Sequence, residues 1–173
     1  MKVYITVLLL LISFLLSAQT KKHKHKTQVK NHKPLFQEYY IANNLNPANA
    51  VTPYLYYQVY DWAGTHYKYA GCTKNGIDCS GFVAEVYKNT YCIDFAGGSK
   101  DIWTLVKPVE KKDLKEGDIL FFKIKKGQIS HVGIYLENNK FAHASVKLGV
   151  IISDLDDAYY KKYFYKGGRI INE

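Results

Sequence analysis

The order of the periodic segments constrains the fold of this chain more than any other feature. Apolar residues at helical spacing come first, and short β-rich runs separated by turn residues follow from Gly117 onward. Because helices and strands are segregated rather than alternating, the sequence predicts an α+β fold in which a small antiparallel β-sheet packs against a helix. We expect helices that begin at Pro53, at or just before Cys79, and at Ser99, strands within 118–124, 131–137, 140–146 and 149–155, and a helical turn and a last strand within 156–171.

One cysteine lies where a helix is expected to begin. The segment Asp78-Cys79-Ser80-Gly81 precedes apolar residues at helical spacing, so Cys79 falls in the first turn. Unpaired backbone N–H groups and the positive end of the helix dipole favour a thiolate there, and the small polar neighbours leave room for a substrate carbonyl. The segment therefore predicts a nucleophile, although a single cysteine is more often a buried or incidental residue.

Two histidines supply the other groups that a thiol nucleophile requires. His131 opens one predicted strand and His143 lies in the next, across a tight turn at Asn138-Asn139. A nucleophile needs a base and the base needs an orienting partner, so we expect His131 to take the proton of Cys79 and His143 to hold the far ring nitrogen of His131. Taken singly, a polar residue at a strand end and a hydrogen-bonded core histidine are the simpler explanations.

Strand geometry sets a condition on this pair of histidines. Directly opposed residues in a hairpin have numbers of constant sum. The numbers 131 and 143 have an even sum, whereas a two-residue loop at Asn138-Asn139 requires an odd one, and a regular hairpin of that kind would place the two imidazoles on opposite faces. A shared site therefore requires a loop of odd length or a β-bulge between the strands.

The first 45 residues are expected to lie outside the folded domain. Residues 1–18 combine Lys2, a short apolar run and small closing residues, which is the layout of a secretory signal peptide, and a single membrane anchor is the alternative. Residues 19–45 are expected to form a basic flexible linker, and residues 46–173 the domain. The mature protein is thus expected to be exported, either periplasmic or secreted.

The basic segment KKHKHKTQVKNHK dominates the formal net charge of +9. This charge favours an anionic partner such as a cell-wall polymer or a membrane surface, and a solvated spacer is the simpler alternative. Nucleic acid is not an expected partner, because the basic residues concentrate in this segment and no recognition motif accompanies them. The histidines of the segment, His23, His25 and His32, lack a cysteine or carboxylate framework, so neither a metal nor another cofactor is expected.

The chain has three cysteines, an odd number for an exported protein. Either Cys72 pairs with Cys92 and leaves Cys79 free, or all three are free. Cys79 is free in both cases, as a nucleophile must be.

Five blocks of sequence between Trp62 and Arg169 are distinctive in combination. They are WAGTHYKYAG, GIDCSGFVAEVY, LKEGDILFF, HVGIYLENNKFAHAS and GVIISDL. In this order and spacing they resemble the NlpC family of bacterial cell-wall cysteine endopeptidases. The resemblance implies a papain-like fold and hydrolysis of peptidoglycan stem peptides, usually at the bond between γ-D-glutamyl and a diamino acid such as diaminopimelate.

The resemblance also implies roles for individual residues. Cys79 matches the family nucleophile, His131 its base, and His143 its polar third member. Tyr67 matches a tyrosine whose hydroxyl lies near the oxyanion position, where the backbone N–H of Cys79 is the other natural donor. The catalytic residues of the family are thus all present.

The substrate contacts of the family are matched less completely. Asp78 and Ser80 match residues that, in some members, bind the free amine of the stem's L-alanine, and Asp78 is equally suited to cap the helix. Ala70-Gly71 stands where the family often has two glycines. Gly97-Gly98 precedes Ser99 where the family often has a proline and an arginine, so the sequence predicts the reaction more firmly than the specificity.

Two alternatives to the endopeptidase remain open at this point. The first is a thiol amidase or acyltransferase of similar fold that acts on another envelope substrate. The second is a catalytically silent domain that binds the cell wall. An inactive relative would most simply lose Cys79 or His131, and this sequence keeps both.

Overall fold

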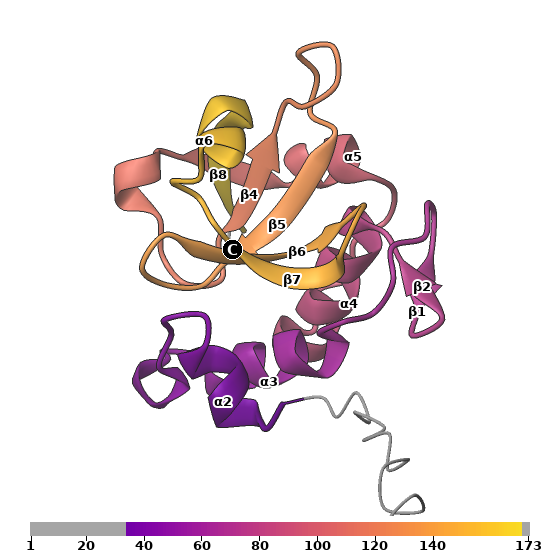
Figure 1. Ribbon diagram of the computed structural model, residues 1–173. Helices are drawn as coiled ribbons and strands as arrows, with labels where there is room; N and C mark the ends of the chain where they lie inside the picture. The colour runs from indigo at the N-terminus through magenta and orange to yellow at the C-terminus, as the bar shows by residue number, and fades with distance from the viewer. Residues whose placement is uncertain (1–33, 171–173) are drawn as a thin grey trace, which may run out of the picture. The chain divides into compact units, whose positions relative to one another are not determined.

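The computed structural model describes residues 34–170 of the chain (Figure 1). Within this range the helices are α2 (Phe36–Ile41), α3 (Pro53–Trp62), α4 (Cys79–Tyr91), α5 (Ser99–Trp103) and α6 (Ala158–Tyr163), with short 3₁₀ turns η2 (Pro47–Asn49) and η3 (Lys111–Asp113). The strands are β1 (Cys72–Thr73), β2 (Gly76–Ile77), β3 (Val106–Val109), β4 (Ile119–Phe122), β5 (His131–Tyr135), β6 (Lys140–Ser145), β7 (Gly149–Asp154) and β8 (Phe164–Ile170). None of the helices in these residues is long and apolar enough to cross a bilayer.

Six strands form one antiparallel sheet in the order β3-β8-β4-β5-β6-β7, while β1 and β2 pair with each other. Helices α3, α4 and α5 precede most of the sheet in the chain, as the segregated pattern predicts, and they begin at the expected residues. Each predicted strand range contains an observed strand. The α+β fold class is therefore confirmed.

Strand β3 is one of the elements that the sequence pattern does not reveal. The periodicity predicts that Val106 continues the helix from Ser99, but α5 ends at Trp103 and Val106 pairs with Ile170 of β8. Pro108 explains the difference, because proline lacks a donor and disfavours helical backbone in the residue before it. A proline is tolerated in β3 because this strand lies at the edge of the sheet.

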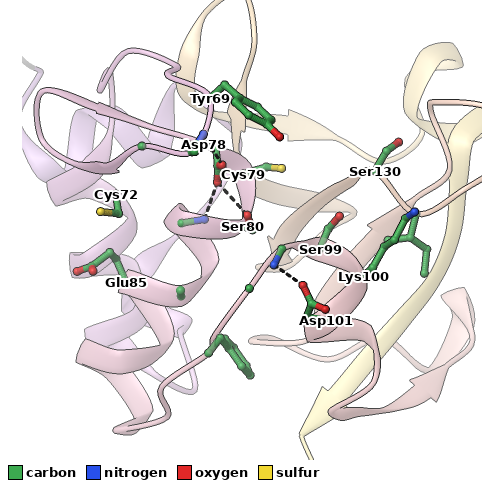
Figure 2. Close-up of a pocket in the computed structure, with 18 of the residues that line it drawn as sticks. Tyr69, Cys72, Asp78, Cys79, Ser80, Glu85, Ser99, Lys100, Asp101 and Ser130 are labelled. Carbon is green, nitrogen blue, oxygen red and sulfur yellow. Dashed lines mark hydrogen bonds between the residues drawn. The ribbon is translucent and has the colours of Figure 1, made fainter.

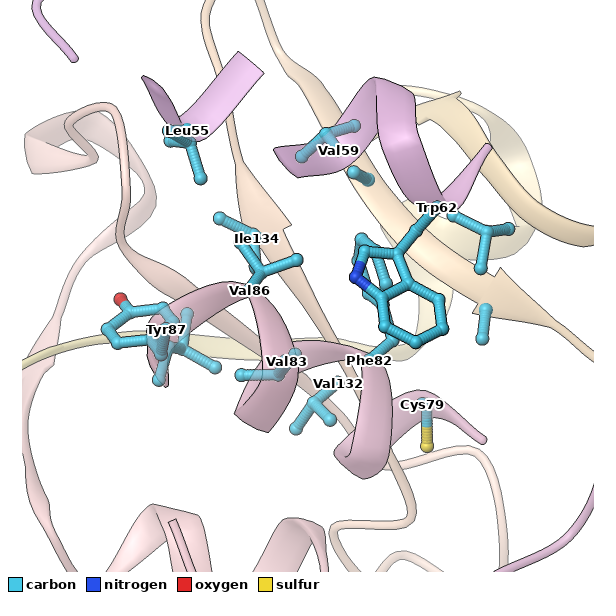
Figure 3. Close-up of a cluster of buried hydrophobic side chains, with 14 of the residues drawn as sticks. Leu55, Val59, Trp62, Cys79, Phe82, Val83, Val86, Tyr87, Val132 and Ile134 are labelled. Atoms are coloured by element: carbon cyan, nitrogen blue, oxygen red, sulfur yellow. The ribbon is translucent and has the colours of Figure 1, made fainter. Parts of the chain in front are cut away.

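A different helix covers each face of the sheet. On one face the apolar stripe of α4 packs on alternate residues of β5 and β6, and Figure 3 shows the centre of this cluster, formed by Phe82, Val83, Val86, Val132 and Ile134. On the other face Phe122 and Phe141 form a smaller cluster to which α6 contributes Tyr160. Because successive strand residues alternate in direction, β4 and β5 are buried on both sides.

The structured domain begins earlier than the sequence predicts. Residues 34–45, expected to belong to the flexible linker, include α2 and two core side chains: Tyr40 is fully buried and Leu45 is 3% exposed. The hydroxyl of Tyr40 donates to the carbonyl oxygen of Tyr56 in α3 at 2.6 Å. The predicted boundary at residue 46 is therefore wrong, because the last part of the supposed linker has apolar residues that pack on α3. The expected signal peptide and the rest of the expected linker lie outside the described residues.

Candidate active site

Asp78 fixes the start of α4 and with it the position of Cys79. Its Oδ1 accepts hydrogen bonds from the backbone N–H of Gly81 at 2.8 Å and from Oγ of Ser80 at 2.9 Å. Its Oδ2 accepts a hydrogen bond from the backbone N–H of Ala70 at 2.9 Å, which ties the preceding loop to the helix. The capping role expected for Asp78 is thus confirmed.

The same loop lies so close to α4 that position 81 has no room for a side chain. A Cβ atom at Gly81 would be 2.6 Å from the carbonyl oxygen of Gly71. Glycine is the residue that permits such a close backbone approach. The backbone around Gly71 therefore lies directly against the first turn of α4.

The environment of the Cys79 thiol differs from the one that the sequence predicts. Burial raises the pKa of the thiol, while the backbone N–H of Val132 and those of Ser80 and Cys79 itself lower it. The start of the helix thus lowers the pKa of the thiol as expected, but burial raises this pKa by more. The expectation of a lowered pKa at Cys79 is wrong, and the structure favours the neutral thiol at neutral pH.

The hairpin between β5 and β6 has a loop of odd length. Tyr135 pairs with Phe141, and the backbone N–H of Leu136 donates to the carbonyl oxygen of Lys140 at 2.9 Å. Three residues, 137–139, therefore connect the strands in place of the two that the sequence suggests. The geometric condition for a shared site is met without a bulge.

The odd loop places His131 and His143 on the same face of the sheet. It is the face of Phe122 and Phe141, which α6 covers, whereas α4 packs on the opposite face. Cys79 can therefore approach the histidines only at one end of the sheet, where His131 is the first residue of β5. The backbone N–H of the next residue, Val132, already acts on the sulfur.

A chain of hydrogen bonds runs from His131 through the sheet. Nε2 of His131 and Nδ1 of His143 are 2.9 Å apart, which confirms that the two rings interact as the sequence predicts. On the other side of the second ring, Nε2 of His143 is 3.0 Å from Oγ of Ser153 and 3.1 Å from the hydroxyl of Tyr160. Ser153 comes from β7 and Tyr160 from α6, so three strands and a helix hold this chain together.

The hydrogen-bond chain is consistent with one arrangement of ring protons that suits a base. If Nδ1 of His131 is to accept a proton, the neutral ring must carry its own proton on Nε2 and donate it to Nδ1 of His143. His143 then carries its proton on Nε2 and donates it to the oxygen of Ser153 or Tyr160. Sequence reasoning missed these two hydroxyl groups, because nothing in the pattern of β7 or α6 marks a residue that points at His143.

Both imidazoles are held in the neutral form. Burial lowers the pKa of His131 to about 4. Burial, and then the charge of His131, lower the pKa of His143 well below its usual value. Two neutral rings in contact avoid the repulsion that two imidazolium ions would suffer.

Tyr67 lies in the same groove as the thiol. Burial raises the pKa of its hydroxyl, and the nearby Cys79 and Asp78 raise it further, so the phenol lies close to both groups. Its backbone pairs with Ile77, directly before the start of α4. The structure therefore brings Tyr67, Asp78 and Cys79 together, as the sequence predicts.

The one predicted contact that the structure does not make is the direct one between Cys79 and His131. Within residues 34–170 no hydrogen bond joins the thiol to the ring. Catalytic hydrogen bonds are often long in unliganded sites and shorten when substrate binds. The structure thus shows the two halves of the site side by side along β5, with the histidine pair assembled.

A groove of about 730 Å³ runs past the thiol (Figure 2). Of the predicted site residues, Tyr67, Asp78, Cys79 and Ser80 line it, whereas the two histidines do not. Its opposite wall comes from α5 and from the loop between β4 and β5, including Ser130, the residue before the predicted base. This volume is in the range that holds a short peptide or another small ligand.

The remaining cysteines form no disulfide. Cys72 and Cys92 are both exposed and free, as is the buried Cys79. Of the two arrangements left open by the sequence, the structure has the one with three free thiols. In the described part of the chain, no three His, Cys, Asp or Glu side chains gather as a metal ion would require.

Comparisons of the sequence find one family of proteins. A profile of the NlpC/P60 family matches residues 64–169, which include all the predicted site residues. The probable endopeptidase NlpC of Escherichia coli K12 is 40% identical over 114 residues, covering 65% of this chain and 74% of the relative. The murein DD-endopeptidase MepS/murein LD-carboxypeptidase of the same strain is 37% identical over 116 residues, covering 66% of this chain and 61% of the relative.

Comparison of the structure leads to the same fold. A crystal structure of an NlpC/P60 family protein from Bacillus cereus ATCC 10987 superposes with a TM-score of 0.65 at 26% sequence identity. The match covers 70% of this chain but only 41% of that protein. The chain thus shares the domain of this larger relative and spans less than half of its length.

Proposed function

Since the chain belongs to the NlpC/P60 family, we propose that it is an exported cysteine endopeptidase that hydrolyses peptidoglycan stem peptides. The expected target is the bond between γ-D-glutamyl and a diamino acid. Of the two Escherichia coli relatives, one is named a probable endopeptidase and the other a murein endopeptidase, and these names support a cell-wall hydrolase. The observation that carries the proposal is the His131–His143 hydrogen bond of 2.9 Å at the end of the strand that contacts the Cys79 thiol.

The first half of the proposed reaction forms a thioester. Sγ of Cys79 attacks the carbonyl carbon of the scissile amide while the thiol proton passes to Nδ1 of His131, the ring nitrogen not engaged by His143. His143 holds the resulting imidazolium in place by accepting from its Nε2–H. Collapse of the tetrahedral intermediate breaks the C–N bond, and the leaving amine takes the proton from His131.

The oxyanion of that intermediate requires hydrogen-bond donors close to the sulfur. The backbone N–H of Cys79 and the hydroxyl of Tyr67 are the two donors that the site offers. Water then attacks the thioester with His131 as base, which releases the new carboxylic acid and regenerates the thiol. No group outside the site is needed to balance the protons.

Asp78 and Ser80 are proposed to bind the free amine of the stem's L-alanine. Both line the groove, and Ser80 donates its hydroxyl proton to Asp78 at 2.9 Å. The Asp78 carboxylate accepts three hydrogen bonds in all, of the roughly four that its two oxygens can accept, so room remains for an ammonium. The capping and substrate-binding roles of Asp78 are therefore compatible.

A second target bond is favoured by a specific comparison. The 37% identical relative is named both a murein DD-endopeptidase and a murein LD-carboxypeptidase. These names describe cleavage next to D-residues further along the stem than D-glutamate. The same nucleophile, base and oxyanion donors would serve either bond, so product analysis must decide between them.

The test of the proposal is mass spectrometry of defined muropeptides incubated with the mature protein. We expect cleavage between D-glutamate and the diamino acid, none with Cys79→Ala, and full activity with Cys92→Ala, which removes an exposed thiol outside the groove. Fragments cut next to a D-alanine would support the second target bond. Release of the whole stem from the sugar would identify an amidase, and an intact substrate with a folded protein would favour the wall-binding alternative.

The basic segment 21–33 is proposed to hold the enzyme near an anionic wall or membrane surface. Attraction of this kind weakens as salt screens the charges. Deletion of residues 21–33 should therefore reduce pelleting with insoluble sacculi at low salt and have less effect at high salt. Equal pelleting of the full-length and shortened proteins at both salt concentrations would leave the segment as a spacer.

A further inference from the structure

Two lysines that form no ion pair with any described residue line one wall of the groove. Lys88, Lys100 and Lys125 all line it, and Lys88 is paired with Asp94 at 3.2 Å. Within residues 34–170 neither Lys100 nor Lys125 forms a salt bridge. On the wall formed by α5 and the loop before β5, these two ammonium groups therefore have no direct ion-pair partner within residues 34–170, although Asp101 lines the same wall.

Lys100 is held in place by one hydrogen bond, and its ammonium group can donate others. Its Nζ donates to Oε1 of Gln128 at 2.6 Å, a bond that links α5 to the loop between β4 and β5. An ammonium group has three donors, so two remain for a ligand. Figure 2 shows Lys100 close to Ser99 and Ser130, across the groove from Glu85.

Ser130 adds a neutral donor to the same wall. Its Oγ accepts a hydrogen bond from the backbone N–H of Lys125 at 3.0 Å, which leaves the hydroxyl proton available to a ligand. The nearest acid in the sequence, Asp101, also lines the groove, and its Oδ2 accepts a hydrogen bond from the backbone N–H of Gly98 at 2.7 Å. Within residues 34–170 no salt bridge joins Asp101 to Lys100 or Lys125, so both ammonium groups can pair with a ligand.

We propose that Lys100 and Lys125, together with Ser130, bind a free carboxylate of the stem peptide and so select the substrate. The inference rests on the proposed function, which supplies the peptide. A γ-linked D-glutamyl residue keeps its α-carboxylate free, and a diamino acid such as diaminopimelate carries another. Hydrogen bonds between ammonium and carboxylate groups are stronger than neutral ones, so either carboxylate is a suitable ligand.

The test compares kcat/KM for one stem peptide in three forms. One form is unmodified, one has the α-carboxylate of D-glutamate amidated, and one has the free carboxylate of the diamino acid amidated. The enzymes are the wild type, Lys100→Gln, Lys125→Gln and Lys100→Arg. Lys161→Gln is the matched control, because it removes the same charge from an exposed position on α6, outside the groove.

We expect Lys100→Gln to lower kcat/KM for the unmodified peptide about tenfold, as loss of one charged hydrogen bond implies. One of the two amidated peptides should show a similar loss with the wild type and little further loss with the variant, which identifies the bound carboxylate. Lys125→Gln should follow the same pattern, Lys100→Arg should restore much of the activity, and Lys161→Gln should match the wild type. Equal losses on all three peptides, or no loss, would overturn the proposal.

A binding measurement separates this proposal from the proposed reaction. Calorimetry with Cys79→Ala reports the affinity of each peptide without turnover. Carboxylate-dependent binding in the absence of wild-type cleavage would support the carboxylate site and reject the endopeptidase. If the wild type cleaves the peptide and neither amidation changes the measured affinity, the carboxylate site alone is rejected.

Discussion

The hydroxyl of Tyr160 lies 3.1 Å from Nε2 of His143, on the side of that ring opposite to His131. Oγ of Ser153 reaches the same nitrogen at 3.0 Å. Two hydroxyl groups from different elements thus accept the proton that His143 must carry on Nε2 if its Nδ1 is to accept from His131. In the proposed mechanism they are positioning residues, because they act on the proposed base, His131, through a second ring.

Removal of both hydroxyl groups should impair the base without weakening substrate binding. We expect Tyr160→Phe to lower kcat only slightly, since Ser153 remains, and Tyr160→Phe with Ser153→Ala to lower it about tenfold at unchanged KM. Nitrogen-15 NMR of the histidines should show the tautomer of His143 shifting in the double variant. Wild-type kcat and an unchanged tautomer in the double variant would show that these hydroxyls only fill space.

The reactivity of Cys79 should depend on pH in the manner of a buried thiol. Because burial raises its pKa, the thiolate fraction at neutral pH is lower than that of an exposed cysteine. The rate of inactivation by iodoacetamide should therefore rise with pH and reach half its maximum above the usual thiol range. Alkylation of Cys92 in Cys79→Ala is the internal reference for an exposed thiol. Inactivation that persists well below pH 7 would instead reveal a thiolate–imidazolium pair.

Acid should destabilise the fold through the buried histidines. The pKa of His131 falls from 6.5 to about 4 on folding, so between these values the unfolded chain binds a proton that the native state does not. The contribution to stability is complete above pH 6.5 and is lost as the pH falls toward 4, by about 3 kcal/mol for this one residue. Chemical unfolding from pH 7 to pH 4 should show a smaller loss for His131→Gln than for the wild type. Parallel curves for the two proteins would contradict the assignment.

The segment before residue 46 should contribute to stability. Tyr40→Ala removes a fully buried ring and the hydrogen bond to Tyr56, so the free energy of unfolding should fall by about 3 to 5 kcal/mol. Tyr57→Ala, at a position 54% exposed on α3, should change it by less than about 1 kcal/mol. Equal effects of the two substitutions in urea unfolding would restore the boundary that the sequence suggested.

Much of the site is predictable because it depends on local signals. The start of α4 is encoded by a capping aspartate followed by an apolar stripe, and both act within a few residues of Cys79. The pairing of His131 with His143 follows from strand alternation once the loop length is fixed. The sequence does not determine that length. Asn138 and Asn139 both adopt left-handed backbone and so mark the turn, but only the observed register shows that Glu137 also belongs to the loop.

The parts that the sequence did not predict depend on contacts between distant segments. The raised pKa of Cys79 reflects how deeply the packed sheet buries the sulfur, which no local pattern reports. Ser153 and Tyr160 meet His143 because β7 and α6 return to the same face. Likewise, Tyr40 becomes a core residue because α3 lies against α2, although the basic residues that precede it suggest a solvated segment.

At loop 137–139, the fold is far more sensitive to the insertion or deletion of a residue than to the substitution of one side chain by another. One inserted or deleted residue would turn every side chain of β6 to the other face, so that Ala142 and Ala144 would exchange places with Phe141 and His143. A change of two residues would keep the alternation. Among descendants of this gene, length variation at this exposed turn should therefore occur in steps of two, although most surface turns accept any length.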